Sequence, residues 1–252
     1  MMDAPHITNL ILGQPYAPDF DDVYTSTTGG VEQSRHVFIE GIELATLAHK
    51  TTPRVQIAEL GVGSGLNLLL TAHTWIQQDC LPALTPVLHL YGVEAAPWTM
   101  DQLAQYYAHV VAQHPELTEI AAQWQAVYPP RMEGAHTLCL VPQRVWVTLV
   151  WGDVMELFEH LDHHGMTADN NPMDAWYLDG FAPSKNPAMW TPEVFEAMST
   201  FSQPHHTRLA TYTVASEVRR NLTTAGFALT QRPGLPPKRE CLSGVFRGQG
   251  PL

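Results

Sequence analysis

Apolar and polar positions alternate along the chain in blocks that predict an open sheet covered by helices. Five short apolar runs have the length and composition of buried strands, and they alternate with segments of helical periodicity. These predicted strands cover 54–60, 87–94, 144–151, 174–178 and 208–213. The connection between two last runs, 227–232 and 240–246, is too short for a crossover helix, so we expect them to pair antiparallel. The order predicts a doubly wound, mostly parallel sheet of seven strands, with one antiparallel strand near its edge.

The spacing of apolar residues also predicts the helices that cover this sheet. They are expected over 37–47, 68–76, 97–125, 191–201 and 217–225. No internal repeat and no low-complexity linker interrupts the chain, which predicts one domain over 1–252. Within it we expect an N-terminal extension over 1–50 and a Rossmann-like core over 51–252.

Composition is that of a soluble globular protein, since 45% of the residues are hydrophobic and 15% are charged. We expect neither a membrane-spanning helix nor a signal peptide, because no long uncharged apolar segment occurs. The three cysteines, Cys80, Cys139 and Cys241, are far apart and odd in number, which is typical of reduced thiols in a cytoplasmic protein. His160 and His164 have helical spacing, but no glutamate between them completes a metal motif, so we expect no metal site.

A glycine-rich turn follows the first predicted strand and opens the next helix. The segment Glu59-Leu-Gly61-Val-Gly63-Ser-Gly65-Leu-Asn67 has the pattern E-x-G-x-G-x-G, which is typical of S-adenosylmethionine sites. Glu94 ends the next strand, where a carboxylate can accept both hydroxyls of a ribose. Asp153 follows the third strand and is a candidate for binding the adenine amino group, although an ordinary turn residue would look the same. A glycine-rich turn without a ligand remains the alternative interpretation.

The segment 177–190 places a carboxylate, Asp179, directly after a buried strand, and an aromatic residue, Phe181, two positions later. Pro183 and Pro187 keep this segment out of any helix or central strand. Reactive groups in open α/β sheets lie at such strand ends, although a plain strand-to-helix connection has the same pattern. Thr191 followed by a proline predicts the start of the next helix.

The net charge of −12 bears on the partner. Proteins that bind nucleic acid without sequence preference are usually basic, because phosphate contacts supply most of their affinity. A polyanionic substrate would therefore need a local basic patch, or another domain or protein that binds it.

Several motifs together resemble one family of tRNA-modifying enzymes. They are Asp19-Phe-Asp-Asp-Val-Tyr24, Glu32-x-x-Arg35-x-Val-Phe38, Gly63-x-Gly65-Leu-Asn67, Asp179-Gly-Phe-Ala-Pro-Ser-Lys-Asn-Pro-Ala-Met-Trp-Thr191, Leu209-Ala-Thr-Tyr-Thr213, Val218-Arg-Arg220 and Lys238-Arg-Glu240. The combination resembles the tRNA 5-methylaminomethyl-2-thiouridine methyltransferase family, known as free-standing MnmD or as the amino-terminal domain of bifunctional MnmC. The chain departs from that family at His205-His206, where a glycine pair is usual, and at Pro236-Pro237, where a glycine and a basic residue are common.

This resemblance implies a class I S-adenosyl-L-methionine-dependent methyltransferase that methylates the aminomethyl group of the tRNA wobble uridine. Asp179 would handle the amine and Phe181 would stack on the uracil. The implied cofactor-binding residues are Glu59, Gly61, Gly63, Gly65, Asn67, Glu94, Asp153 and Asp179. Candidate substrate residues are Asp21, Asp22 and Tyr24, which would form a lid, and Lys185, Arg219, Arg220, Lys238 and Arg239, which would contact phosphates. A flavin-dependent oxidase, as a domain or a separate protein, would act in the same pathway.

Two alternatives stay open at this stage. A small-molecule amine methyltransferase of the same fold would suit the acidic charge. A non-catalytic module that binds the cofactor would also keep the fold, although the intact segment 179–190 speaks against it.

Overall fold

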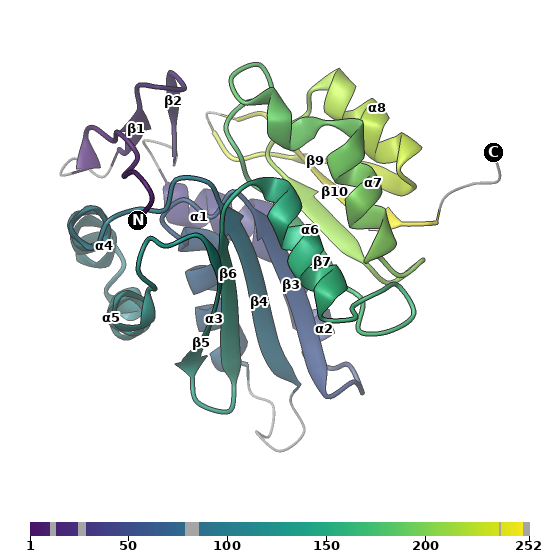
Figure 1. Cartoon of the computed structure of the whole chain (residues 1–252), viewed down its shortest axis with the longest axis horizontal. Helices are drawn as coiled ribbons and strands as arrows, with labels where there is room; N and C mark the ends of the chain where they lie inside the picture. Colours follow the sequence, from purple (N-terminus) through teal and green to yellow (C-terminus); the bar gives the residue numbers. More distant parts are fainter. Residues whose placement is uncertain (11–13, 25–28, 79–85, 237, 249–252) are drawn as a thin grey trace.

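The computed structural model describes residues 1–10, 14–24, 29–78, 86–236 and 238–248, and Figure 1 shows their arrangement. A single eight-stranded sheet runs through the middle in the order β5-β6-β4-β3-β7-β8-β10-β9. Its strands are β3 (Arg54–Leu60), β4 (Val87–Glu94), β5 (Gly134–Val141), β6 (Val145–Trp151), β7 (Ala175–Leu178), β8 (Arg208–Thr211), β9 (Phe227–Pro233) and β10 (Glu240–Phe246). The sheet is therefore doubly wound about β3, as the sequence pattern predicts.

Strand directions confirm the mostly parallel sheet and correct its size. β6, β4, β3, β7 and β8 pair in parallel, and β10 runs against both β8 and β9. The prediction of seven strands with one antiparallel strand is wrong by one strand, because β5 adds an antiparallel edge to β6. Most side chains of β5 are only partly buried, so the run lacks the continuous apolar character of the inner strands.

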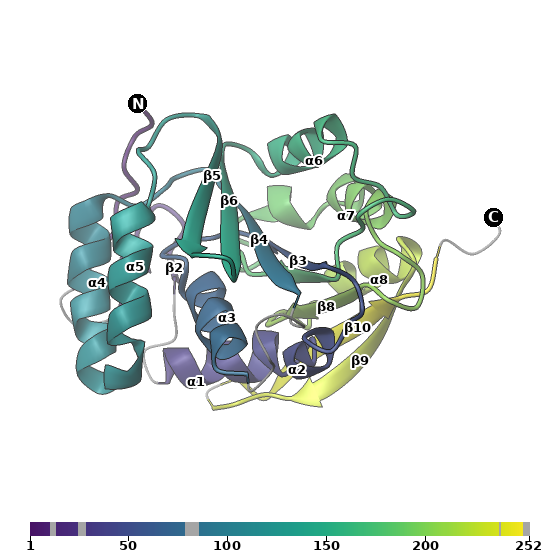
Figure 2. The ribbon, with the colours of Figure 1, turned by 90° about the horizontal axis from the view of Figure 1, so that it is seen from below.

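Helices cover both faces of the sheet, as Figure 2 shows. They are α1 (Gly30–Ser34), a π-helix (Arg35–Ile39), α2 (Leu44–Leu47), α3 (Leu66–Ile76), α4 (Met100–Gln113), α5 (Thr118–Val127), α6 (Val154–His163), α7 (Pro192–Thr200) and α8 (Ser216–Thr224), with 3-10 turns at Pro115–Leu117 and Pro187–Trp190. Residues of α3, α4, α5 and the π-helix form one apolar core, while α6, α7 and α8 form the other. The sheet is thus buried on both faces, which explains its continuous apolar strands.

The single helix predicted over 97–125 is two helices. α4 ends at Gln113 and α5 begins at Thr118, with Pro115 in the turn between them. Proline has no N–H to donate within a helix and its ring collides with the preceding turn, so the helix ends before it. The predicted start of α7 is confirmed, since the Thr191 side chain accepts a hydrogen bond from the Val194 N–H.

The N-terminal segment contributes a small hairpin, β1 (Tyr16–Ala17) and β2 (Asp22–Val23). No helix among the described residues is long and apolar enough to cross a membrane.

The cysteines and the histidine pair are placed as follows. Cys139 and Cys241 are free thiols, and Cys80 lies outside the described residues. The rings of His160 and His164 lie 4.2 Å apart. Within the described ranges, no group of three or more His, Cys, Asp or Glu side chains could hold a metal.

Candidate active site

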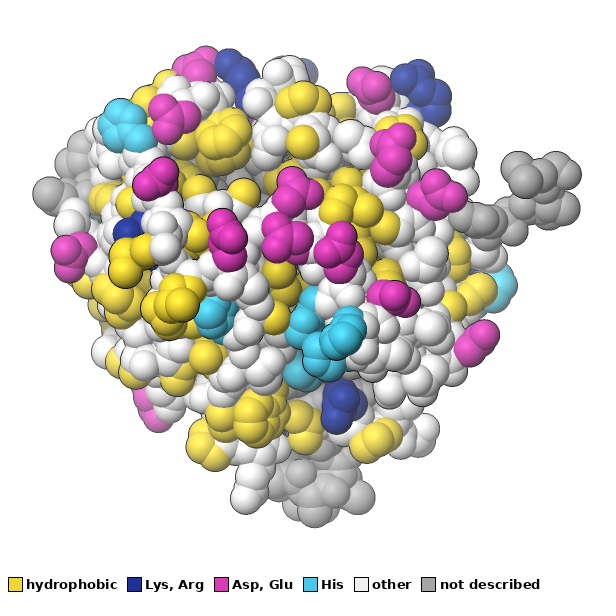
Figure 3. All heavy atoms as spheres, in the orientation of Figure 1, with side chains coloured by type: hydrophobic (Ala, Val, Ile, Leu, Met, Phe, Trp, Pro, Cys, Tyr) yellow, Lys and Arg dark blue, Asp and Glu magenta, His cyan; other side chains and the backbone are white. Residues whose placement is uncertain are grey.

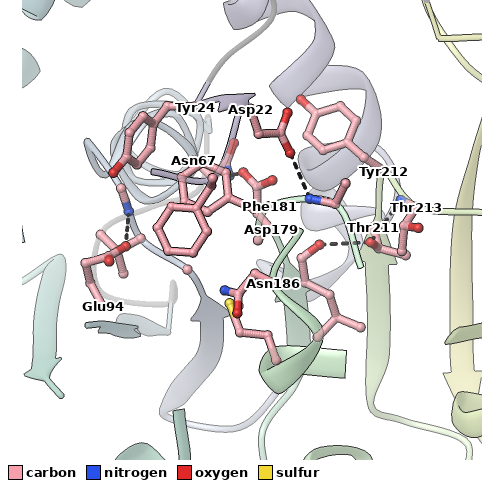
Figure 4. A pocket seen from close by; sticks show the side chains of 18 of the residues that line it. Asp22, Tyr24, Asn67, Glu94, Asp179, Phe181, Asn186, Thr211, Tyr212 and Thr213 are labelled. Carbon is pink, nitrogen blue, oxygen red and sulfur yellow. Dashed lines mark hydrogen bonds between the residues drawn. The ribbon is translucent and has the colours of Figure 1, made fainter. Parts of the chain in front are cut away.

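A cavity of about 510 Å³ opens at the carboxyl ends of the central strands (Figure 4). Its walls come from the turns that follow β3, β4, β6, β7 and β8, together with the N-terminal hairpin. The charged side chains that line it are four carboxylates and one lysine: Asp22, Glu94, Asp153, Asp179 and Lys238. This excess of negative charge favours a cationic ligand.

The glycine-rich turn after β3 forms part of the cavity wall. Gly61 and Gly63 line the cavity, whereas Gly65 does not. Gly63 has φ +53°, and a Cβ there would lie 3.2 Å from the Tyr24 ring. A Cβ on Gly65 would lie 2.1 Å from the Trp124 ring, so Gly65 is required for packing between α3 and α5. The prediction that Gly65 contacts a cofactor therefore finds no support in the geometry.

Glu94 is held beside this turn by two backbone donors. The N–H groups of Gly63 and Ala96 each donate to one of its carboxylate oxygens, both at 2.9 Å (Figure 4). Burial raises the pKa of Glu94, and these hydrogen bonds act in the opposite direction. Each oxygen keeps a further lone pair for a ligand hydroxyl. A glycine turn with an oriented carboxylate beside it fits the ribose and methionine portions of S-adenosylmethionine.

Asp153 lines the same cavity and also begins α6. Its side chain accepts from the Met155 N–H at 3.0 Å, while the Glu156 side chain accepts from the Asp153 N–H, which completes a capping box. The D-x-x-E pattern in the sequence already indicates this cap. Asp153 therefore has a structural role as a helix cap, and it lies in the cavity wall, where the predicted contact to adenine would be made.

Asp179 lines the cavity and is hydrogen-bonded to the first turn of α3. The Asn67 side chain donates from Nδ2 to Asp179 Oδ2 at 2.6 Å and to Glu59 Oε1 at 2.6 Å. Burial raises the pKa of Asp179 to about 6, against the opposing effects of the Asn67 hydrogen bond and of Lys238. Glu59 is fully buried and does not line the cavity, so the geometry does not place it against a cofactor as predicted.

The segment after Asp179 is fastened to the N-terminal hairpin. The Ala182 N–H donates to Asp22 Oδ2 at 2.9 Å, and Lys185 Nζ lies 2.6 Å from Asp21 Oδ2. The Phe181 ring stacks on Phe20 with centroids 4.4 Å apart. The Tyr24 ring meets the Phe181 ring edge-on at 5.0 Å. Asp22 and Tyr24 therefore line the cavity as a lid would, whereas Asp21 and Lys185 lie outside it.

The remaining predicted cations fall into two groups. Lys238 lines the cavity, and its Nζ lies 4.9 Å above the ring of Tyr212. Arg239 is exposed next to it, and Arg219 and Arg220 are exposed on α8, outside the cavity lining. Sequence reasoning missed Phe20 and Tyr212 as wall residues. Tyr212 follows β8 at the same sheet edge as Asp179, and that position was the available signal.

Comparisons with known proteins agree with this geometry. The strand order, the glycine turn after β3 and the acid after β4 define a class I S-adenosyl-L-methionine-dependent methyltransferase fold. A family model described as S-adenosyl-L-methionine-dependent methyltransferase matches residues 115–247, more than half of the chain. The chain therefore belongs to this family, and S-adenosylmethionine is its cofactor.

Two relatives carry the resemblance further. The tRNA 5-methylaminomethyl-2-thiouridine biosynthesis bifunctional protein MnmC of Magnetococcus marinus is 39% identical over 240 residues, which are 94% of this chain and 33% of that protein. The chain thus spans about a third of the length of this relative. The crystal structure of MNMC2 from Aquifex aeolicus superposes with a TM-score of 0.64 at 17% identity, and the match covers 95% of this chain and 69% of that one. These matches confirm the resemblance predicted from the motifs, and the second one confirms the fold.

Proposed function

We propose that this methyltransferase transfers the methyl group of S-adenosylmethionine to the primary amine of 5-aminomethyl-(2-thio)uridine at the wobble position of tRNA, giving 5-methylaminomethyl-(2-thio)uridine. The observation that carries the proposal is a half-buried carboxylate with a raised pKa, Asp179, beside the glycine turn in an acidic cavity. Such a cavity attracts a cationic aminomethyl group. The 39% identity to a bifunctional MnmC supports the tRNA substrate.

Bound S-adenosylmethionine supplies an electrophilic methyl group on its sulfonium. The amine is mostly protonated near neutral pH, so it must lose a proton before its lone pair can attack. Asp179 Oδ2 already accepts from Asn67, which leaves Oδ1 to accept an amine N–H or its proton. Holding the amine by its N–H bonds turns the lone pair toward the methyl group, which is a contribution of orientation.

The uracil would bind at Phe181, as aromatic side chains bind unstacked bases in RNA. One face of that ring is covered by Phe20, whose centroid lies only 4.4 Å away. A base cannot enter between two rings at this separation. We therefore infer that Phe20 moves away, together with the lid residues Asp22 and Tyr24, when the nucleotide enters.

The acidic surface limits how tRNA can approach. On the face in Figure 3, acidic side chains are spread over the upper half and basic side chains are few. Among the described basic residues, Lys238 lines the cavity and Arg239 follows it in the chain, and both are exposed. Lys185 is already paired with Asp21, so it is less available to a phosphate. We infer that phosphates contact Lys238 and Arg239, with Arg219 and Arg220 on α8 as a more distant contact. Of the two prolines at which the chain departs from the family here, Pro236 and Pro237, the second lies outside the described residues.

The same proposal covers the pathway and the cell compartment. A flavin-dependent oxidase, as a fused domain or a separate protein, would generate the aminomethyl substrate that this chain methylates. The name of the relative, a bifunctional biosynthesis protein, supports a second activity in the same pathway. Action on tRNA implies a cytoplasmic protein.

The variant Asp179→Ala tests the catalytic assignment, with Asp179→Asn as an isosteric companion. We expect methyl transfer to aminomethyl-bearing tRNA to fall by about 10²–10⁴-fold, the usual contribution of general acid–base catalysis. Cofactor binding, measured by calorimetry, should persist in Asp179→Asn. Methyl transfer near the wild-type rate by a folded variant would refute the assignment of Asp179.

The two alternatives predict different results in the same assays. A small-molecule amine methyltransferase would leave bulk tRNA from a strain lacking the enzyme unmethylated while it methylates a free amine. A non-catalytic module would bind the cofactor without turnover. The acidic cavity is compatible with the first alternative. The hydrogen bond from Ala182 to Asp22, which holds the segment 179–190, and the raised pKa of Asp179 favour catalysis over the second.

A further inference from the structure

The Asn67 carboxamide joins two carboxyl groups that stand on neighbouring strands. Glu59 is on β3, and Asp179 follows β7, which pairs in parallel with β3. Both hydrogens of Asn67 Nδ2 are used, one toward Glu59 Oε1 and one toward Asp179 Oδ2, each at 2.6 Å. Asn67 lies in the first turn of α3 and therefore fixes both groups relative to the glycine turn.

No cation among the residues that the structure describes compensates Glu59. Its side chain has no exposed surface, and no described lysine, arginine or histidine forms an ion pair with it. The charged groups that act on it are two more carboxylates, Asp179 and Glu94. A negative charge on Glu59 would also raise the pKa of Tyr107 on α4, Tyr177 on β7 and Tyr212 after β8. An ionised carboxylate in such a place is very unfavourable, so burial raises the pKa of Glu59 well above its ordinary value.

Two atoms of this group lack a hydrogen-bond partner. Glu59 Oε2 and Asn67 Oδ1 are both buried, and neither has a donor among the described residues. Both atoms accept hydrogen bonds when the glutamate is ionised. A proton on Glu59 Oε2 converts it into a donor, and a hydrogen bond to Asn67 Oδ1 would then satisfy both atoms at once.

We propose that Glu59 is a protonated carboxylic acid that forms a two-hydrogen-bond pair with the Asn67 carboxamide, and that this pair is a positioning device for Asp179. Glu59 acts through Asn67 and does not touch the substrate. A neutral Glu59 also removes one negative charge from beside Asp179, whose other charged neighbours are Asp22 from the hairpin and Lys238 from the segment before β10. With Oδ2 held by Asn67, Asp179 Oδ1 faces the amine. This last step rests on the proposed function.

The protonation state can be observed without turnover or cofactor. Infrared difference spectra of the wild type minus Glu59→Gln at neutral pH should contain the C=O stretch of a protonated carboxylic acid. The same difference spectrum should contain no band from an ionised Glu59 carboxylate. A carboxylate band in place of the acid band would overturn the proposal, whatever the substrate of the enzyme.

Kinetics separate positioning from cofactor binding. Removing the pair with Glu59→Ala should lower kcat by about tenfold to a hundredfold, because a small displacement of a catalytic group costs this much. Glu59→Gln should rescue most of that loss, since its amide accepts from Asn67 Nδ2 and donates to Asn67 Oδ1 as the neutral acid does. The Kd of S-adenosylmethionine, measured by calorimetry, should not follow kcat.

An ionic role would give the opposite result. If Glu59 bound the ammonium group of the cofactor as a carboxylate, Glu59→Gln would lose cofactor affinity as Glu59→Ala does, and kcat at saturating cofactor would recover in both variants. That outcome overturns the proposal. If tRNA is not the substrate, the infrared result and the cofactor affinities still decide the state of Glu59, so the two failures are distinguishable.

Discussion

Replacing Glu59 by glutamine should change how the stability of the protein depends on pH. Glu59 is fully buried beside Asp179, and its folded-state pKa lies well above the value of 4.5 that applies in the unfolded chain. The folded protein therefore holds a proton that the unfolded chain releases. For a group with a raised pKa, stability is greatest below the unfolded pKa and is lost as the pH rises toward the folded pKa. Glutamine carries no such proton, so Glu59→Gln escapes this loss.

The magnitude follows from one proton. Where the folded chain holds it and the unfolded chain does not, the wild type loses about 1.4 kcal/mol of unfolding free energy per pH unit. If the folded chain keeps this proton throughout, as the proposal requires, the loss between pH 5 and pH 7 amounts to about 2.5 kcal/mol, since part of the unfolded chains still holds the proton at pH 5. Asp179 titrates in both proteins, and its contribution largely cancels in the difference. Glu59→Gln should therefore gain stability over the wild type by this amount across the interval.

Urea unfolding followed by tryptophan fluorescence at pH 5, 6 and 7 measures the difference. Glu159→Gln is the matched control, because Glu159 is exposed on α6 and meets water in both the folded and unfolded states. The difference between the control and the wild type should stay flat. A flat difference for Glu59→Gln as well would refute the reasoning, since it would mean that Glu59 is ionised in the folded protein.

Three further predictions concern the cavity and its surface. Gly63→Val should abolish S-adenosylmethionine binding in calorimetry. The backbone of Gly63 has φ +53°, which disfavours valine, and the new side chain would lie against the Tyr24 ring in the cavity wall. Retained affinity would contradict the cofactor site. Single-turnover methyl transfer should fall as the pH is lowered through about 6, where Asp179 becomes protonated and can no longer accept from the amine; an unchanged rate between pH 5 and pH 7 would exclude this. Arg239→Gln should weaken tRNA binding and reduce the slope of log affinity against log salt by about 1, and an unchanged slope would place the phosphate elsewhere.

Much of the fold could be predicted because its elements are buried on both sides. Strands such as β3 and β7 are almost continuously buried and mostly apolar, and their order along the chain leaves few possible topologies. β5 could not be found in the same way, since its residues are mostly half-buried at the sheet edge. The break between α4 and α5 was predictable from Pro115, whose effect on a helix is local and strong.

Part of the candidate site was likewise predictable from the sequence, and part of it was not. Glu94 and Asp179 were found because strand ends at one edge of a parallel sheet converge. The bond from Asn67 to both Glu59 and Asp179 was not predictable, because it depends on side-chain directions across three elements. Charge pairing is also invisible in sequence. Lys185 looks like a phosphate contact until the hairpin brings Asp21 to it.

The most direct test of the account is the nucleoside product. Hypomodified tRNA that carries 5-aminomethyl-(2-thio)uridine is incubated with the protein and S-adenosylmethionine, digested, and analysed by liquid chromatography and mass spectrometry. The account predicts that this nucleoside disappears and that 5-methylaminomethyl-(2-thio)uridine, heavier by one methylene, appears in equal amount. An unchanged nucleoside, with a folded protein that binds the cofactor, would contradict the account.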